Sequence, residues 1–368
     1  MFFRFRSRFQ KKKLNDGAKM FAPANCVLTE WIDPKGMAEA RQDLSKLLRA
    51  HPAKMKRLKY LRDYLDAVDR TYGNPRLDGP NGYLGRPLDC IYTCIRSGRM
   101  YCMTHRFPAF IASDQPRYIC TQGMPSVLRP YLMRRWVHDL DIANCHVTLM
   151  FQLGKYYHAW PEHAGRDVEP LHLNVLQEVD GNRAAFIQHV ADAHYIDQDA
   201  DHYPGYRKEF VKPLLLRVMY GGSYEAWMEE NGLYGHKCQR VVDLEREMRA
   251  LRRVVVSSMR FAPLAAAERS VQERRKRSPL EIERGIFSKI AQHLECVVLM
   301  SMCDYLASHG WRIHSLVYDG LTVEHRADTV IDTSAIERHV EGGTQFIVSI
   351  VEKPLFSNSR PDPDSLLR

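Results

Sequence analysis

The sequence predicts an α+β protein in which helices cover an antiparallel sheet. Apolar residues recur at helical spacing in residues 36–70 and 281–308. An Asp-Gly pair joins two short apolar runs within residues 313–324, which is the pattern of a β-hairpin. Strand-like segments at Trp136 and at residues 346–351 would complete the sheet. Helices packed on such a sheet form a layered core.

A pair of helices is expected within residues 36–70, broken at His51-Pro52 because proline interrupts helical hydrogen bonding. The apolar face of the second helix would consist of Met55, Leu58, Leu61, Leu65 and Val68. Its other side carries Lys54, Lys56, Arg57, Lys59 and Arg62. Such a row of cations is usually a solvated face, and a face that grips nucleic acid is the alternative.

The remaining helices and the tail follow from periodicity and stop signals. Helical patterns extend to Tyr157 and return in residues 165–200, 205–260 and 281–308, with a charged stretch, Glu268–Arg277, before the last of these. His309-Gly310 marks the end of that helix. A final helix over residues 334–340 precedes the last strand, and the tail from Ser357 is expected to be disordered.

Charge and cysteine usage narrow the class of protein. The 368 residues include 53 Lys and Arg against 44 Asp and Glu, which gives a net charge of +9. A basic surface suits a partner with a phosphate backbone, although many basic proteins bind no nucleic acid. Nine cysteines without a Cys-x-x-Cys pair indicate reduced thiols and an intracellular location. The longest apolar run is five residues, Cys296–Met300, so no membrane span of ~20 residues is expected.

The N-terminal arm, residues 1–30, opens with a segment rich in Lys and Arg that has no acid before Asp16. It lacks the apolar segment of a secretory signal. A solvated, flexible arm is favoured. A nucleic-acid-binding arm and an organelle transit segment are the alternatives.

The run His138–Met150 offers the first candidate for catalysis. Asp139 and Asp141 are two residues apart, so both would point to the same side of a strand. The pattern then becomes helical, which places Asp141 at the end of that strand. The alternative is that Asp141 only caps the helix that begins near Asn144.

A second acid, Asp319, lies in the predicted hairpin, where turn chemistry alone would explain it. Two carboxylates on neighbouring strands could hold two divalent cations about 3.5–4 Å apart, as phosphoryl transfer to a growing strand requires. The sequence alone does not show that Asp141 and Asp319 meet.

A third candidate is a stripe of side chains on one helix. Lys208, Lys212, Leu216 and Tyr220 are four residues apart, and each such step drifts only ~40° around a helix. Two cations and an aromatic ring in this arrangement could grip a triphosphate and support a base pair. An amphipathic helix stopped by two glycines is the alternative, and Pro213 disturbs its early hydrogen bonds.

Taken in order, these segments resemble the polymerase region of family A, DNA polymerase I-like, DNA polymerases. That family has TGR-x-LQNIP with a following Arg, then DYSQIE, R-x3-K-x7-YG and a strand ending VHDE-x-VVE. This chain has SGR at Ser97–Arg99, TQGMP at Thr121–Pro125, Arg129, DIANCH at Asp141–His146, K-x3-K-x7-YG over Lys208–Gly221 and LVYDGLTVE over Leu316–Glu324. The resemblance spans residues 97–324.

The resemblance implies a role for each matching residue. Asp141 and Asp319 would be the catalytic ligands of two Mg²⁺ ions, for which Mn²⁺ can substitute. Lys208 and Lys212 would contact the triphosphate, and Tyr220 would lie beside the nascent base pair. His146 takes the place of a Glu that blocks a ribose 2′-hydroxyl. Arg99 would hold the primer–template backbone, with Gln122 and Arg129 near it.

Several positions depart from the family pattern. Gly320 replaces the acid after the second catalytic Asp, and Tyr318 replaces the His before it. Asn144 stands where Gln is usual, and Leu216 where an aromatic is usual. His146 is either the same steric gate or a change in sugar choice. The pattern Asp-x-x-Asn-x-His is also similar to the Asp-x-x-Ser-Leu-Tyr of family B enzymes.

The expected function is template-directed DNA synthesis without a proofreading exonuclease, for which the chain has no room. The partners would be a primer–template, dNTPs and replication accessory proteins, with no membrane. An RNA polymerase or primase on the same palm, and a non-catalytic nucleic-acid-binding protein, are the alternatives. The right-hand-like arrangement would comprise a thumb-like helical basic lobe (31–135), palm segments (136–200 and 281–356), helical fingers (201–280) and a disordered tail (357–368).

Overall fold

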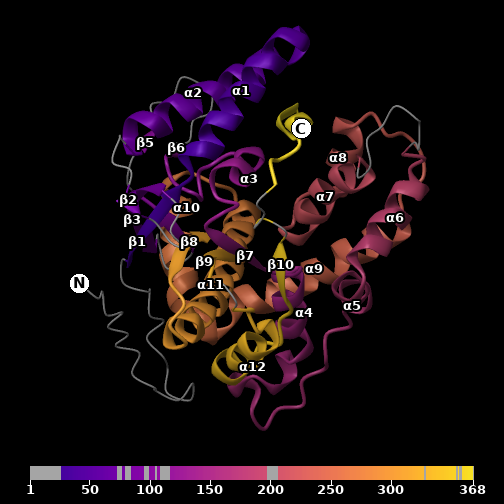
Figure 1. Cartoon of the computed structure of the whole chain (residues 1–368). Coiled ribbons are helices and arrows are strands. Elements are labelled where there is room, and N and C mark those ends of the chain that lie inside the picture. The colour runs from indigo at the N-terminus through magenta and orange to yellow at the C-terminus, as the bar shows by residue number, and fades with distance from the viewer. Residues whose placement is uncertain are drawn as a thin grey trace.

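A four-stranded antiparallel sheet lies at the centre of the molecule and positions the site (Figure 1). In the computed structural model its strand order is β10-β7-β9-β8, with bounds Val137–Ile142 for β7, Ile313–Val317 for β8, Gly320–Glu324 for β9 and Ile350–Lys353 for β10. Leu140 and Ile142 of β7 are buried, whereas Asp139 and Asp141 are half-buried. Since side chains alternate along a strand, β7 has one apolar and one acidic face.

The structure describes residues 26–72, 77–78, 84–94, 99–103, 106–107, 117–196, 206–326, 329–353, 355 and 359–367. Within them the protein is a mixed α/β fold with 12 α-helices and two four-stranded antiparallel sheets. A separate strand pair joins β5 (Arg106–Phe107) to β6 (Arg117–Tyr118).

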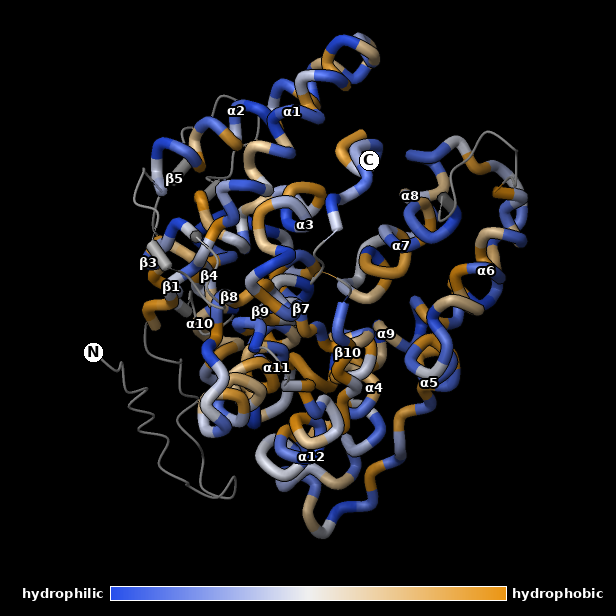
Figure 2. Tube along the Cα trace, in the orientation of Figure 1, coloured by the Kyte–Doolittle hydropathy of each residue, from blue (hydrophilic) through white to orange (hydrophobic). Residues whose placement is uncertain are grey.

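The N-terminal lobe combines the second sheet with a helical hairpin. Its elements are β1 (Cys26–Ile32), α1 (Pro34–Ala50), α2 (Met55–Tyr72), β2 (Leu77–Asp78), β3 (Leu84–Cys94), β4 (Met100–Cys102) and α3 (Arg129–Leu132). A 3-10 turn at Pro52–Lys54 separates α1 from α2 and confirms the predicted break. The predicted apolar face of α2 is buried except for Met55, its first residue. Figure 2 shows the hydrophilic outer side of both helices.

A second helical lobe lies to the right of the central sheet in Figure 1, where α5 to α8 are labelled. The helices after β7 are α4 (Cys145–Lys155), α5 (Asn174–Gly181), α6 (Arg183–Ala193), α7 (Tyr206–Met219), α8 (Tyr224–Glu230), α9 (Gln239–Ser257), α10 (Ala262–Arg274), α11 (Pro279–Ser308) and α12 (Thr333–Thr344). Apart from α10, they agree with the helical stretches that periodicity predicts after Trp136.

Helix α11 is the central helix of the larger apolar core. Ser278 and Glu281 form a capping box at its start, and its C-cap is His309 as predicted. By length and composition α11 could cross a membrane, but 67% of its most apolar window is buried inside the protein. It packs against α4, α9, α10 and α12. This packing accounts for its apolar composition.

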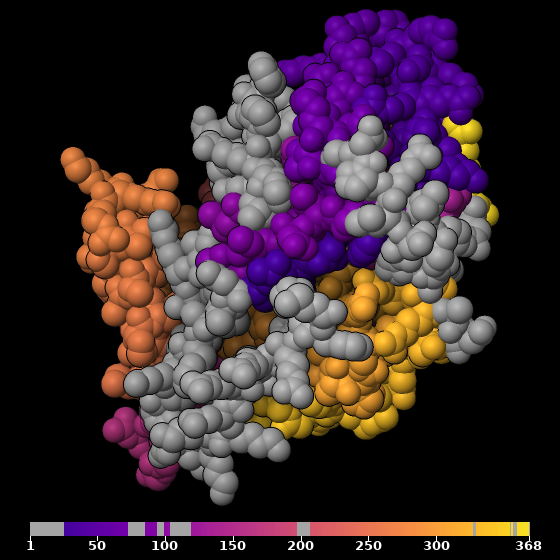
Figure 3. Space-filling view, turned by 60° about the vertical axis from the view of Figure 1, so that its left-hand side comes forward, coloured from indigo at the N-terminus to yellow at the C-terminus, as the bar shows by residue number. Residues whose placement is uncertain are grey.

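The two sheets contact each other through β1 and β8. His314 of β8 is fully buried, and its Nε2 accepts a 2.7 Å hydrogen bond from the backbone N–H of Trp31. In Figure 3 the indigo N-terminal lobe lies directly against the orange and yellow C-terminal segments. The N-terminal lobe is therefore anchored on the sheet that carries the site.

Two expected boundaries around the sheet were wrong. The hairpin turn consists of Tyr318 and Asp319, and Gly320 is already the first residue of β9. The last strand begins at Ile350 rather than at residue 346. The side chain of Gln152 binds both backbone groups of Ile347, at 2.9 Å and 2.6 Å, and so replaces strand pairing there.

The termini and the charged stretch also differ from expectation. Strand β1 begins at Cys26, so part of the expected N-terminal arm is a strand, and residues 1–25 lie outside the described residues. Most of Glu268–Arg277 belongs to α10, because Leu264, Ala265 and Glu268 are buried on one side of that helix. The tail was expected to be disordered, but residues 363–367 form a 3-10 helix.

The tail docks because it has both an apolar and an ionic anchor. Leu366 is completely buried in the N-terminal core. The guanidinium of Arg360 pairs with the carboxylate of Asp43, which is itself buried on α1. A buried charge needs such a partner, so the tail completes the N-terminal lobe.

A buried carboxylate in this lobe makes stability depend on pH. Glu30 of β1 accepts hydrogen bonds from the Tyr92 hydroxyl at 2.5 Å and from the Thr121 N–H at 2.6 Å. Burial raises the pKa of Glu30 from 4.5 to about 7, against the opposing effect of these hydrogen bonds. The folded state therefore keeps a proton at pH values where the unfolded chain has lost it.

We expect the contribution of Glu30 to stability to be complete below pH 4.5 and to decline as the pH rises to about 7. The difference between the two pKa values corresponds to roughly 3 kcal/mol. Urea unfolding of the wild type and Glu30→Gln at pH 4.5 and pH 8 measures this effect. The wild type should lose more stability than the variant between those pH values. Parallel losses in the two proteins would show that Glu30 is not the titrating group.

Candidate active site

Asp141 and Asp319 meet at one end of the central sheet. Asp141 pairs in register with Gly320, the residue that follows Asp319. The backbone N–H of Ile142 donates a 3.0 Å hydrogen bond to the carbonyl oxygen of Asp319. Both aspartates are half-buried. Two acids far apart in the chain thus occupy adjacent strand ends.

The electrostatics agree with this proximity. Burial raises the pKa of Asp319, and the negative charges of Asp141 and Glu295 raise it further. A carboxylate whose ionisation is disfavoured by neighbouring acids is typical of cation and catalytic sites, although structural clusters produce the same effect. The helix-cap alternative for Asp141 is not supported, because Asn144 is the N-cap of α4 and Asp141 forms an ion pair instead.

Gly320 allows the two strands to approach beside Asp141. A Cβ at this position would lie 2.6 Å from the carbonyl oxygen of Leu140 and 3.0 Å from Oδ1 of Asp141. The preceding Tyr318 has a left-handed backbone with φ of 56°, which is unusual for a bulky residue. A side chain larger than that of glycine therefore has no space at position 320.

Lys353 of β10 places a positive charge against the acidic face of β7. Its Nζ lies 2.7 Å from Oδ2 of Asp141, and its side chain is 51% exposed. It also opposes Asp139 in register. Burial raises the pKa of Asp139, while the charges of Lys353 and Arg129 counteract this effect. The exposed ammonium of Lys353 shows that a positive charge is stabilised beside the carboxylate of Asp141.

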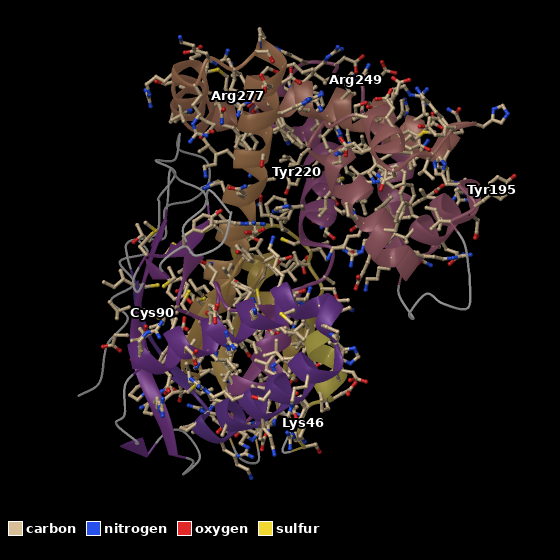
Figure 4. All side chains as sticks on the ribbon, turned by 90° about the horizontal axis from the view of Figure 1, so that it is seen from above. Lys46, Cys90, Tyr195, Tyr220, Arg249 and Arg277 are labelled. Carbon is tan, nitrogen blue, oxygen red and sulfur yellow. The ribbon has the colours of Figure 1, made fainter. Side chains whose placement is uncertain are left out.

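Helix α7 contains the first three residues of the predicted stripe, and Tyr220 follows directly after its end. Lys208, Lys212 and Leu216 are exposed, and neither lysine has an ion-pair partner among the described residues. Pro213 lies inside the helix without ending it. The helix stops before Tyr220 and Gly221, whose φ of 81° favours glycine. Figure 4 shows Tyr220 near the middle of the molecule, between the lobe with Arg249 and the lobe with Lys46.

Tyr220 contacts His146 and thereby joins two of the sequence motifs. The Tyr220 hydroxyl hydrogen-bonds to Nδ1 of His146, and the two rings meet edge to face with centroids 5.7 Å apart. His146 lies on α4, one turn beyond the end of β7. The structure thus brings together two side chains that the sequence assigned separately to nucleotide binding.

Glu295 of α11 lies next to the other ring nitrogen of His146, Nε2, and is completely buried. Its carboxylate accepts two hydrogen bonds of 2.5 Å from Arg99, at Nε and at one terminal nitrogen. Nε2 of His146 lies 2.7 Å from Oε2 of Glu295, although without the angle of a well-formed hydrogen bond. Burial raises the pKa of Glu295, but His146 and Arg99 outweigh burial and leave this pKa below its usual value. Glu295 is therefore an ionised carboxylate.

Cys145, His146 and Glu295 also lie close enough together to suggest a metal site. Both carboxylate oxygens of Glu295, however, are already occupied by the guanidinium of Arg99. Burial raises the pKa of the Cys145 thiol well above its usual value, and nearby carboxylates add to the effect. A metal would have to compete with a cation and bind a protonated thiol, so the aspartate pair is the better cation site.

The residues expected near the nucleic acid have distinct environments. Arg99 lies over the ring of Tyr318, 5.1 Å from its centroid. The amide of Gln122 binds backbone groups of Met100, Cys102 and Leu316, so in this structure it connects β4 to β8. Arg129 begins α3, and its Nε is buried without a hydrogen-bond partner among the described residues. Ser97 and Gly98 lie outside the described residues. The expected contacts of Arg99, Gln122 and Arg129 with nucleic acid remain predictions.

Sequence reasoning missed Glu295 and Lys353 as neighbours of the site. A signal for Glu295 was present, since it is a single acid within the most apolar stretch of the 281–308 helix. Lys353 gave no signal, because a lysine in an edge strand is commonplace.

The comparisons with known proteins are sparse. No family model matches the chain, and no curated protein matches it. Among solved structures it is similar to the POL domain of Pol1 from M. smegmatis in complex with a DNA primer-template and dNTP. The TM-score is 0.40 at 12% sequence identity, and the match covers 88% of this chain and 56% of that chain. The chain thus spans about half the length of that protein.

Proposed function

We propose that this chain is a template-directed nucleotidyltransferase, most specifically a DNA-directed DNA polymerase. The observation that carries the proposal is the meeting of Asp141 and Asp319 at adjacent strand ends. The order of the sequence motifs and the exposed lysines of α7 support it. In this proposal the central sheet is the palm, the lobe with α7 the fingers, and the α1–α2 hairpin the thumb.

The donor set at the aspartate pair fits divalent cations. Carboxylate oxygens are the ligands that Mg²⁺ prefers, and Asp319 has no ion-pair partner within the described residues. When bound by Asp141 and Asp319, two Mg²⁺ ions would supply charge neutralisation and activation of the primer 3′-hydroxyl. Mn²⁺ has the same preference for oxygen ligands and can substitute.

The chain's own residues bind and orient the substrates. Lys208 and Lys212 attract the triphosphate of a dNTP to the exposed face of α7. Tyr220 supports the nascent base pair, and His146 beside it faces the sugar. Arg99 holds the primer–template backbone, with Gln122 and Arg129 close to it. Positioning by these groups aligns the attacking hydroxyl with the phosphorus.

Primer extension with labelled DNA tests the proposal. The purified protein should add dNTPs to a primer on a DNA template when Mg²⁺ is present and stop when EDTA is added. Preferred use of rNTPs, or synthesis without a primer, would instead select the RNA polymerase or primase function. Salt-sensitive DNA binding without extension under any of these conditions would identify a non-catalytic nucleic-acid-binding protein.

Removing the positive charge of Lys353 should strengthen Mg²⁺ binding. The ammonium of Lys353 neutralises Asp141 and so competes with the metal. Exposed ion pairs contribute ~0.2–1 kcal/mol, so Lys353→Met should lower the half-saturating Mg²⁺ concentration by about 1.4- to fivefold. Primer extension over a Mg²⁺ titration measures this concentration. Lys353→Arg keeps the charge and should behave as the wild type. A higher Mg²⁺ requirement in Lys353→Met would contradict the competition.

A further inference from the structure

One buried carboxylate holds a residue assigned to the sugar and a residue assigned to the primer strand. Glu295 on α11 binds Arg99 through both carboxylate oxygens and lies 2.7 Å from Nε2 of His146. Three segments far apart in the sequence therefore converge on one side chain. A completely buried acid in an apolar helix is costly, and its contacts with Arg99 and His146 offset that cost.

The ring of His146 is fixed from both sides. Its Nδ1 binds the Tyr220 hydroxyl from the end of α7, and its Nε2 faces Glu295 from α11. Only 12% of the His146 side chain is exposed, which leaves little room for another rotamer. A 180° turn of the ring would put carbon atoms in the places of Nδ1 and Nε2 and break both contacts. The position of this ring therefore depends on Glu295.

We propose that Glu295 is a positioning residue that fixes His146 and thereby sets the discrimination between deoxyribo- and ribonucleoside triphosphates. This inference rests on the proposed function. A steric gate excludes a 2′-hydroxyl only while it cannot move aside, since close packing gives it its selectivity. Without the Glu295 carboxylate, the His146 ring has a single partner and can rotate away from the sugar.

Discrimination is measured as the ratio of kcat/KM for a dNTP to that for the matching rNTP. Glu295→Gln should lower this ratio by about tenfold or more, because the close contact of His146 Nε2 with a carboxylate becomes a contact with an uncharged amide. His146→Ala should lower it by a similar or larger factor. The double variant should be no worse than His146→Ala, because coupled residues are not additive. Independent, additive losses, or an unchanged ratio in Glu295→Gln, would overturn the proposal.

Glu247→Gln is the matched control for the loss of a buried carboxylate. Glu247 lies on α9 and accepts hydrogen bonds of 3.0 Å and 2.9 Å from the N–H groups of Val175 and Leu176. Its replacement should leave the discrimination ratio within about twofold of wild type. An equal loss in Glu247→Gln would show that any buried acid has this effect, and would overturn the proposal. If Glu295→Gln does not fold, Glu295→Asp keeps the charge for Arg99 but shortens the reach to His146, and the same loss is expected.

A second measurement is independent of polymerase activity. Nitrogen-15 NMR of the imidazole reports which ring nitrogen of His146 carries the proton and how fast that proton exchanges. In the wild type a proton on Nε2 of His146 should exchange slowly with water and give a signal. In Glu295→Gln this proton should exchange rapidly, and its signal should be lost. An identical His146 spectrum in the two proteins overturns the positioning role even if both extend primers. Absence of extension by the wild type would refute the proposed function, while the spectrum alone would still decide whether Glu295 fixes the ring.

Discussion

Asp141→Asn and Asp319→Asn should each reduce primer extension by ~10²–10³-fold while the protein stays folded. Replacing a carboxylate by an amide of equal size removes the charge that holds a divalent cation, and groups that act directly on developing charge typically contribute ~10²–10³-fold. Single-turnover extension with saturating dNTP measures the effect. Primer–template binding without Mg²⁺ should persist in both variants.

Folding should survive because neither carboxylate supports the core. The pKa of Asp319 is raised by burial and by the charges of Asp141 and Glu295, so its ionised form is unfavourable in the folded protein. The Asp319→Asn protein should therefore unfold at the same urea concentration as wild type or at a higher one. Asp141 loses an ion pair with Lys353, and such a pair contributes ~1 kcal/mol or less.

Asp139→Asn is the control on the same strand. Asp139 lies on the same face of β7 as Asp141, but it opposes Lys353 and Thr322 in register rather than the hairpin turn. Its replacement should leave extension within about tenfold of wild type. Extension that survives in Asp141→Asn or Asp319→Asn, or a loss as large in Asp139→Asn, would remove the aspartate pair as the catalytic centre.

Gly320→Ala should reduce the extension rate by about 10²-fold, with little effect on the KM for dNTP. The new methyl group would lie 2.6 Å from the Leu140 carbonyl oxygen, which belongs to a paired strand and cannot move without disturbing it. Strand β9 must then shift away from β7, and the carboxylate of Asp141 must turn. A displacement of ~1 Å at reacting groups costs about this factor. Overpacking should also destabilise the fold by ~1–3 kcal/mol.

Gly342→Ala is the matched control, since an added Cβ at Gly342 of α12 meets nothing within 4 Å. It should keep full activity and unfold no more easily than wild type. Gly320→Asp, which adds a larger side chain at the same position, should be at least as damaging as Gly320→Ala. Wild-type rates in either Gly320 variant would show that the close approach of β9 to β7 is not needed.

The same contact explains why sequence reasoning misplaced the hairpin turn by one residue. Asp-Gly is a strong two-residue turn signal, so local chemistry favoured Asp319-Gly320 as the turn. In the structure Tyr318 takes the left-handed conformation, and Gly320 is used for its small size beside Leu140. A contact with another strand thus overrides the local preference, and no local pattern contains that information.

The sequence by itself determined the long helices, the hairpin and the side chains that give the site its chemistry. Periodicity within one segment fixes α2 and α11, and the four-residue spacing of Lys208 and Lys212 places both lysines on one side of α7. These features depend on neighbours a few residues away, which a linear pattern records.

Only the tertiary structure decided which of these elements meet. It placed Asp141 beside Asp319, Lys353 against Asp141, and Glu295 behind His146. It also docked Arg360 and Leu366 of the tail on the N-terminal lobe. An apolar face specifies that it will be buried but not by which partner, because hydrophobic attraction has no direction. The identity of the partner follows from the packing of the whole chain. The contacts of a buried acid such as Glu295 could therefore be identified only in the tertiary structure.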